Sequence, residues 1–143
     1  MKLVKHILKL KGSEVWSVDP GSSVYDAVDF MAEKGIGALL VMESSRLIGI
    51  ISERDYARQI ILKGRASEST KVSEIMTTDM VTAGPEQDVG ECMVLMTDRR
   101  VRHLPILEGT RVIGVISIGD LVNAIIAEQQ STIKDLEKYI SGG

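Results

Sequence analysis

Apolar and polar positions along the chain follow one order of elements twice. In each half, a short apolar run closed by a proline precedes a stretch with apolar residues at helical spacing. Two apolar runs joined by a short polar loop come next, and then a second helical stretch. Spacings of three and four residues indicate one buried helix face, and paired apolar runs indicate a buried hairpin. The predicted unit is β-α-β-β-α.

The expected elements have defined bounds. The first helix of each half begins after Ser23 or Asp88, side chains whose oxygens can cap free backbone donors. The second helix starts near Asp55 or Asp120, and in the first half it ends at a left-handed Gly64. The expected strands are 15–18, 38–42, 47–51, 80–83, 103–107 and 112–116.

The two halves are copies of one another. Sliding the chain by 65 residues aligns 13–61 with 78–126 without a gap, so that Gly49 falls on Gly114. One unit alone leaves an apolar sheet face exposed, so the copies are expected to pack with pseudo-twofold symmetry. The predicted fold is α+β, with these parts: an N-terminal helix at 1–12, repeat 1 at 13–64, a linker at 65–77, repeat 2 at 78–127, and a C-terminal amphipathic helix and tail at 128–143.

Both ends of the chain have amphipathic patterns. Residues 1–12 lack a small-residue cleavage site and indicate a short helix ending at Gly12 rather than an export signal. In the C-terminal tail, Ile133, Leu136 and Ile140 fall on one helical stripe. That stripe requires a partner.

Composition excludes several classes of protein. A net charge of -3 and aromatic residues at 3% argue against a nucleic-acid surface. One cysteine and two histidines provide neither a disulfide nor a metal-ligand set. The apolar runs are shorter than the roughly 20 residues needed to cross a bilayer. We therefore expect a soluble cytoplasmic protein with no nucleic-acid or membrane partner.

Polar residues end the last apolar run of each copy. The pattern Gly-apolar-apolar-Ser-x-x-Asp occurs at 49–55 and again at 114–120. A serine hydroxyl and the free amides at a helix start can bind an oxyanion or a hydroxyl. An aspartate three residues later can accept hydrogen bonds from both hydroxyls of a ribose. The alternative is that Ser52, Asp55, Ser117 and Asp120 are only helix caps.

These motifs resemble a known family. The pattern V-x-P-x-x-S-V-x-D-A-V-x-x-M through "LLVMESSRLIGIISERD", then "VSEIMT" and "VRHLPILEGTRVIGVISIGD", is similar to a tandem pair of cystathionine-β-synthase (CBS) domains, a Bateman module. The chain resembles the small stand-alone CBS-pair proteins. The resemblance implies a homodimer of pairs that binds an adenosine-containing ligand in clefts between the repeats.

The resemblance also implies roles for individual residues. Ser52 with Asp55, and Ser117 with Asp120, would contact ribose and phosphate. The adenine would lie against apolar side chains and backbone of two strands in each copy: Trp16, Val18, Ile36, Gly37 and Ala38 in the first, and Val81, Ala83 and Val101 to His103 in the second.

Basic residues differ between the copies and suggest a phosphate. Arg54, Arg58, Arg102 and His103 are the candidates for phosphate contacts, whereas Gly119 replaces Arg54 in the second copy. The expected ligand is therefore AMP or ADP, with NAD, ATP and S-adenosylmethionine following in that order. His103 and Trp16 also fit packing roles, and Cys92 fits the core.

Two functions fit the sequence. The first is a non-catalytic nucleotide sensor that regulates an unidentified protein target. The second is a structural or interaction protein with an unoccupied cleft, acting through its C-terminal helix. An enzyme is disfavoured, because the chain has no P-loop, no GxGxxG, no Ser-His-Asp order and no metal set, and no catalytic cofactor is expected.

Overall fold

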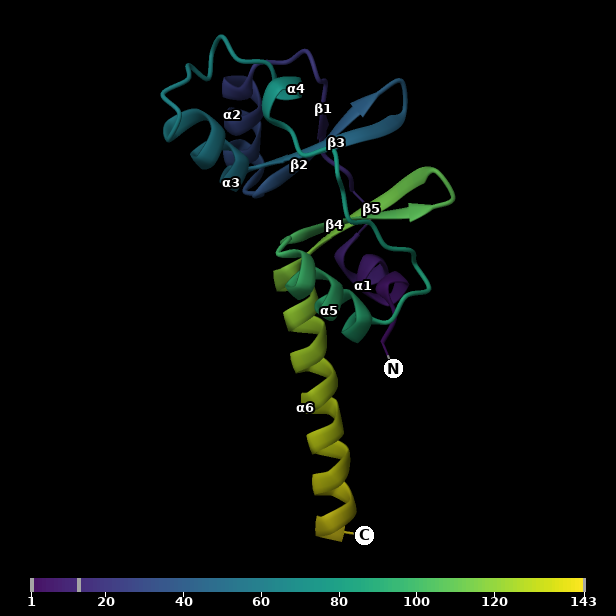
Figure 1. The fold of residues 1–143 in the computed structure, drawn as a ribbon. Coiled ribbons are helices and arrows are strands. Elements are labelled where there is room, and N and C mark those ends of the chain that lie inside the picture. The colour runs from purple at the N-terminus through teal and green to yellow at the C-terminus, as the bar shows by residue number, and fades with distance from the viewer. Residues whose placement is uncertain (1, 13, 143) are drawn as a thin grey trace. The chain divides into compact units, whose positions relative to one another are not determined.

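The fold of the chain comes from a computed structural model that describes residues 2–12 and 14–142 (Figure 1). It divides into two compact units, each made of more than one segment of the chain. Unit 1 takes the described residues of three ranges, 1–14, 81–109 and 113–143, and unit 2 takes 15–80 and 110–112. Residues 2–12 therefore fold with the second copy of the repeat.

Unit 2 is built on a three-stranded sheet. The strand order is β1-β2-β3, with β1 parallel to β2 and β2 antiparallel to β3. Its helix α2 (Val24–Lys34) begins after Ser23, whose Oγ accepts a hydrogen bond from the Asp26 N–H at 3.0 Å, as the sequence predicts. The strands are β1 (Ser17–Val18), β2 (Ala38–Glu43) and β3 (Arg46–Ser52). The buried core consists of Val24, Ala27, Met31, Leu39, Val41, Ile51, Ile60, Val72 and Ile75.

Unit 1 repeats this plan with a smaller sheet. Among its described residues, only β4 (His103–Glu108) and β5 (Arg111–Ser117) pair as strands. Helix α5 (Val89–Arg99) begins after the predicted cap Asp88. The side chains of its core are Val4, Ile7, Leu8, Ala83, Val89, Cys92, Met96, Leu104, Ile106, Ile116, Leu121 and Ala124.

The expected strand at 80–83 is wrong; a single bridge between Ala83 and Ile106 takes its place. In unit 2 the Leu40 N–H donates to the Trp16 carbonyl at 3.2 Å. Pro105 occupies the position of Leu40 in the second copy and has no N–H to donate. Residues 80–83 therefore lack the hydrogen bond that Trp16 of unit 2 receives next to β1, and they form no strand.

The helix that follows each hairpin begins near its aspartate, as predicted. α3 (Glu53–Tyr56) and α6 (Ile118–Gly142) start directly after Ser52 and Ser117, two residues before Asp55 and Asp120. α3 continues as a π-helix, η1 (Ala57–Ile61), and Gly64 has the predicted left-handed conformation at φ +65°. The structure forms a single helix, α6, where the sequence analysis expected one helix in repeat 2 and another in the tail (Figure 1).

Two short helices hold equivalent places in the two units. In unit 2, α4 (Val72–Ile75) is tied by its Val72 N–H to the Ser22 carbonyl at 2.8 Å. In unit 1, α1 (Val4–Lys11) is tied by its Val4 N–H to the Gln87 carbonyl at 2.9 Å. The segment 2–12 therefore closes unit 1 as the segment 70–77 closes unit 2.

Candidate functional site

The Ser52–Asp55 segment, here called the unit 2 tip, is held by reciprocal hydrogen bonds. Asp55 Oδ2 accepts from the Ser52 N–H at 2.9 Å and from the Ser52 hydroxyl at 3.0 Å, while the Asp55 N–H donates to Ser52 Oγ at 3.2 Å. The Thr77 hydroxyl lies 3.4 Å from Asp55 Oδ1. Both tip side chains are half-buried at the end of β3.

The unit 1 tip, Ser117–Asp120, has the same arrangement. Asp120 Oδ2 accepts from the Ser117 N–H at 2.8 Å, and the Asp120 N–H donates to Ser117 Oγ at 3.1 Å. All four residues therefore make the hydrogen bonds of helix caps. A cap does not exclude a ligand, because a carboxylate has acceptor capacity for more than one partner. Ribose contact at both tips stays a prediction.

Some of the expected adenine contacts lie beside the tips, and others lie farther along the strands. The Glu53 N–H donates to the Gly37 carbonyl at 3.0 Å, and Ala38 is the register partner of Ser52, which places 36–38 against the unit 2 tip. In unit 1 the Ile118 N–H donates to the Arg102 carbonyl at 2.9 Å. Val18 pairs with Val41 of β2, and Ala83 bonds across to β4. Val81 and Val101 are half-buried against the unit 1 core.

Trp16 packs against α2. Its ring meets Phe30 edge-on, with centroids 5.8 Å apart, and the Lys34 ammonium lies 4.5 Å from the ring centroid. Such a cation–π contact stabilises the ring where it is. The packing role of Trp16 is thus evident, and its contact with a base remains a prediction.

Lys11 is a residue of the site that the sequence analysis missed. Its Nζ lies 2.6 Å from Asp120 Oδ2 and 2.7 Å from the Val115 carbonyl oxygen. The available signal was the pair "VKHIL" at 4–8 and "VSEIM" at 72–76, which share Val at the first position and Ile at the fourth, at an offset of 68 rather than 65. This pair indicates that 4–8 is the counterpart of 72–76.

Charge and burial perturb two groups at the unit 1 tip. Partial burial acts to raise the pKa of Asp120, but the hydrogen bond from Lys11, the Ser117 N–H and the Lys11 charge together hold that pKa below its ordinary value. Burial lowers the pKa of His103, and the charges of Lys11 and Arg102 add to this effect while Asp120 opposes it. Lys11, Arg102, His103 and Asp120 therefore form one electrostatic cluster.

A histidine titration tests this cluster. We expect the His103 ring to titrate below its ordinary pKa, and Lys11→Met to raise that pKa by removing a neighbouring positive charge. Because the unfolded chain then binds a proton more readily than the folded one, stability should fall as the pH drops from about 6.5 through the folded pKa. An NMR titration of the ring checks this. A His103 pKa at or above the ordinary value would contradict the described cluster.

The other candidate basic residues have different exposures. Arg54 is half-buried in α3, whereas Arg58 on η1 and Arg102 before β4 are exposed. Cys92 lies in the core as expected, and burial raises the pKa of its thiol, so it is a poor nucleophile.

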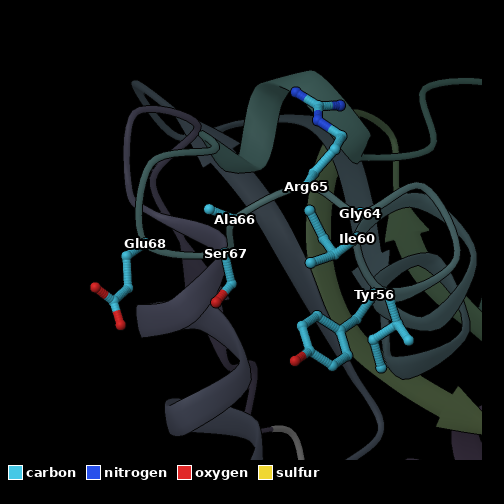
Figure 2. A pocket seen from close by; sticks show the side chains of 8 residues that line it. Tyr56, Ile60, Gly64, Arg65, Ala66, Ser67 and Glu68 are labelled. Carbon is cyan, nitrogen blue, oxygen red and sulfur yellow. The ribbon is translucent and has the colours of Figure 1, made fainter.

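A separate open pocket of about 510 Å³ lies in unit 2. Figure 2 shows Tyr56 and Ile60 on one side of it and the loop from Ala66 to Glu68 on the other. Its cation, Arg65, is bound to Glu74 at 2.7 Å. None of the predicted ligand contacts lines this pocket.

Two kinds of feature are absent from the residues that the structure describes. No helix within 2–12 and 14–142 is both long and apolar enough to cross a membrane. Over the same residues, no three or more His, Cys, Asp or Glu side chains gather where they could hold a metal ion.

Known proteins resemble the chain over most of its length. A protein of Arabidopsis thaliana, "CBS domain-containing protein CBSX3, mitochondrial", is 45% identical over 137 residues, which cover 92% of this chain and 66% of that protein. The chain thus spans just under two thirds of that relative. A solved protein with CBS domains from Burkholderia ambifaria MC40-6 is 50% identical, with a TM-score of 0.86 and coverage of 90% and 96% of the two chains.

A more distant structure shares the fold. It is the CBS domain pair of protein MJ0100, solved in complex with methylthioadenosine and S-adenosyl-L-methionine, at 22% identity and a TM-score of 0.79 over 90% of this chain and 98% of that one. The CBS domain family itself matches twice, over residues 5–62 and 72–127. Because these two matches include both tips and nearly all of both cores, the chain belongs to the CBS-domain family and carries two CBS domains in tandem.

Proposed function

We propose that the protein is a non-catalytic regulatory module that binds adenine nucleotides at its two tips. The observation that carries the proposal is the twofold Ser-x-x-Asp tip, a half-buried carboxylate held by capping hydrogen bonds. Of the residues expected to hold an adenine, Gly37 and Ala38 lie beside the tip of unit 2 and Arg102 beside that of unit 1. A fixed carboxylate and a helix N-terminus suit the hydroxyls of a ribose and an attached phosphate.

The choice of ligand follows from charge. The MJ0100 pair was solved with two adenosyl compounds, which supports an adenosyl ligand for the same fold. Here Arg54, Arg102 and Lys11 supply positive charge close to the tips, and this favours a phosphate. AMP or ADP is therefore the proposed ligand, ahead of NAD, ATP and S-adenosylmethionine.

Binding can be tested directly. Mass spectrometry of small molecules that copurify with the protein identifies an endogenous ligand, and calorimetry with AMP, ADP, NAD, ATP and S-adenosylmethionine ranks affinity. We expect AMP or ADP to bind most tightly. If none of the five compounds gives measurable heat and no adenosyl compound copurifies, the proposed function is wrong.

A second candidate function rests on α6. Ile133, Leu136 and Ile140 are exposed along its C-terminal part, as the sequence analysis expected of a stripe that needs a partner. This favours an interaction protein whose tips remain empty, and it is compatible with a homodimer or a protein target. Truncation after Ala127 would abolish that function, while alanine at Asp55 and Asp120 would leave it unchanged. The proposed location is the cytoplasm.

A further inference from the structure

We propose that Lys11 makes the unit 1 tip selective for phosphate-bearing adenosine ligands over uncharged ones. The inference rests on the proposed function, and it assigns a specificity role to a residue of α1. It also gives the two tips different ligand preferences, since neutral groups of Thr77 make the corresponding contacts in unit 2.

The Lys11 ammonium makes contacts in unit 1 that the backbone N–H and hydroxyl of Thr77 make in unit 2. There, the Thr77 N–H donates to the Ile50 carbonyl at 2.8 Å and the Thr77 hydroxyl lies 3.4 Å from Asp55 Oδ1. At an offset of 65, Ile50 corresponds to Val115 and Asp55 to Asp120. The Lys11 ammonium contacts the carbonyl of the one and the carboxylate of the other, at 2.7 and 2.6 Å.

The longer helix of unit 1 makes this possible. α1 has eight residues and α4 has four, so α1 continues for another turn before it ends at Lys11. In unit 2, α4 is shorter, and Thr77 in the segment that follows it forms a β-bridge with Ile50. The same contacts are thus made by neutral groups in unit 2 and by a positive charge in unit 1.

The ammonium can serve a ligand without leaving its place. An ammonium has three N–H donors, and the described contacts of Lys11 use Asp120 and Val115. The Lys11 side chain retains 37% of its exposure, so the remaining donor is accessible. The described bonds of Asp120 fall on Oδ2, which leaves Oδ1 for a ribose hydroxyl. A nucleotide can therefore contact Asp120 with its sugar and Lys11 with its phosphate.

The surroundings add to the positive charge. Lys11 contacts Asp120 directly, and the Arg102 carbonyl accepts a hydrogen bond at 2.9 Å from the N–H of Ile118, the residue after Ser117. The charges of both residues also lower the pKa of His103. AMP gains a charge-assisted hydrogen bond there, whereas uncharged adenosine gains none and competes with Lys11 for Asp120. Without Lys11, Asp120 becomes a better acceptor for the hydroxyls of adenosine while AMP loses its cation.

The experiment is an NMR titration of the full chain with AMP and, separately, with adenosine. The Ser117 amide reports the unit 1 tip and the Ser52 amide reports the unit 2 tip. Lys11→Met is compared with Lys9→Met, which removes the same charge from an exposed position of the same helix, and with Lys11→Arg, which keeps the charge. Loss of the charge-assisted bond is expected to lower the preference for AMP over adenosine at Ser117 about 10- to 100-fold in Lys11→Met.

The outcomes separate this inference from the function on which it rests. Support requires that the preference falls at Ser117 but not at Ser52, and that Lys9→Met and Lys11→Arg keep it. If AMP binds and Lys11→Met weakens both ligands equally or neither, Lys11 is only a structural link and the inference is overturned while the proposed function stands. If neither ligand shifts Ser117 in the wild type, both fail at this tip.

Discussion

Replacing Asp55 with alanine is expected to weaken AMP binding at the unit 2 tip by about 30- to 1000-fold, the loss of two charged hydrogen bonds to a ribose. Asp120→Ala is expected to have an effect of the same order at the unit 1 tip. Each substitution should leave the other tip unaffected, since the tips lie in different units. Calorimetry on the two variants and the wild type measures both affinities.

Both aspartates are also helix caps, so a loss of binding needs a matched control. Asp88 caps α5 through Oδ2, which accepts from the Glu91 N–H at 3.3 Å, and it lies outside the tips. Removing such a cap costs about 0.5–2 kcal/mol of stability, so Asp88→Ala should lower the unfolding free energy but not the affinity. Equal loss of affinity in Asp88→Ala and Asp120→Ala would show that the tip acts only through stability.

Replacing Ile7 with alanine is expected to lower the free energy of unfolding by about 2–5 kcal/mol, as truncation of a buried isoleucine does. Ile7 is 6% exposed and lies in the unit 1 core together with Val4 and Leu8. Helix α1 therefore supplies part of the unit 1 core, and truncating its buried side chain leaves a cavity there. Urea denaturation measures the loss, and amide exchange should show weaker protection in β4 and β5.

Leu10 on the same helix is the control for Ile7. It is 82% exposed, so Leu10→Ala should change the unfolding free energy by less than about 0.5 kcal/mol. If Ile7→Ala were as mild as Leu10→Ala, α1 would not be packed on unit 1 as described. The position of Lys11 beside Asp120 would then also be in doubt.

Local pattern was sufficient to predict most elements. The hairpin strands were expected within one residue of their observed ends, and the caps at Ser23, Asp88, Ser52 and Ser117 were recognisable because capping depends on residues three apart in the chain. The two Ser-x-x-Asp motifs were found for the same reason. Burial of Cys92 also followed from its place on the apolar face of a helix.

Contacts between distant segments could not be predicted in this way. The strand expected at 80–83 depends on an N–H that Pro105 lacks, more than twenty residues away. The ungapped offset of 65 aligned the repeats but did not show that 4–8 correspond to 72–76, which requires an offset of 68.

The sequence by itself determined the duplicated β-α-β-β-α order, the CBS-domain resemblance and the two polar tips, since all of these depend on periodicity and short motifs. Only the tertiary structure decided which copy the N-terminal helix completes. The N–H groups of Val4 and Lys5 donate to the carbonyls of Gln87 and Pro85, which lie about 80 residues away in the chain. Because the hydrophobic effect is not directional, the apolar pattern of a helix does not identify the surface on which it packs. That choice brings Lys11 to Asp120, so the charge of the unit 1 tip is a property of the fold.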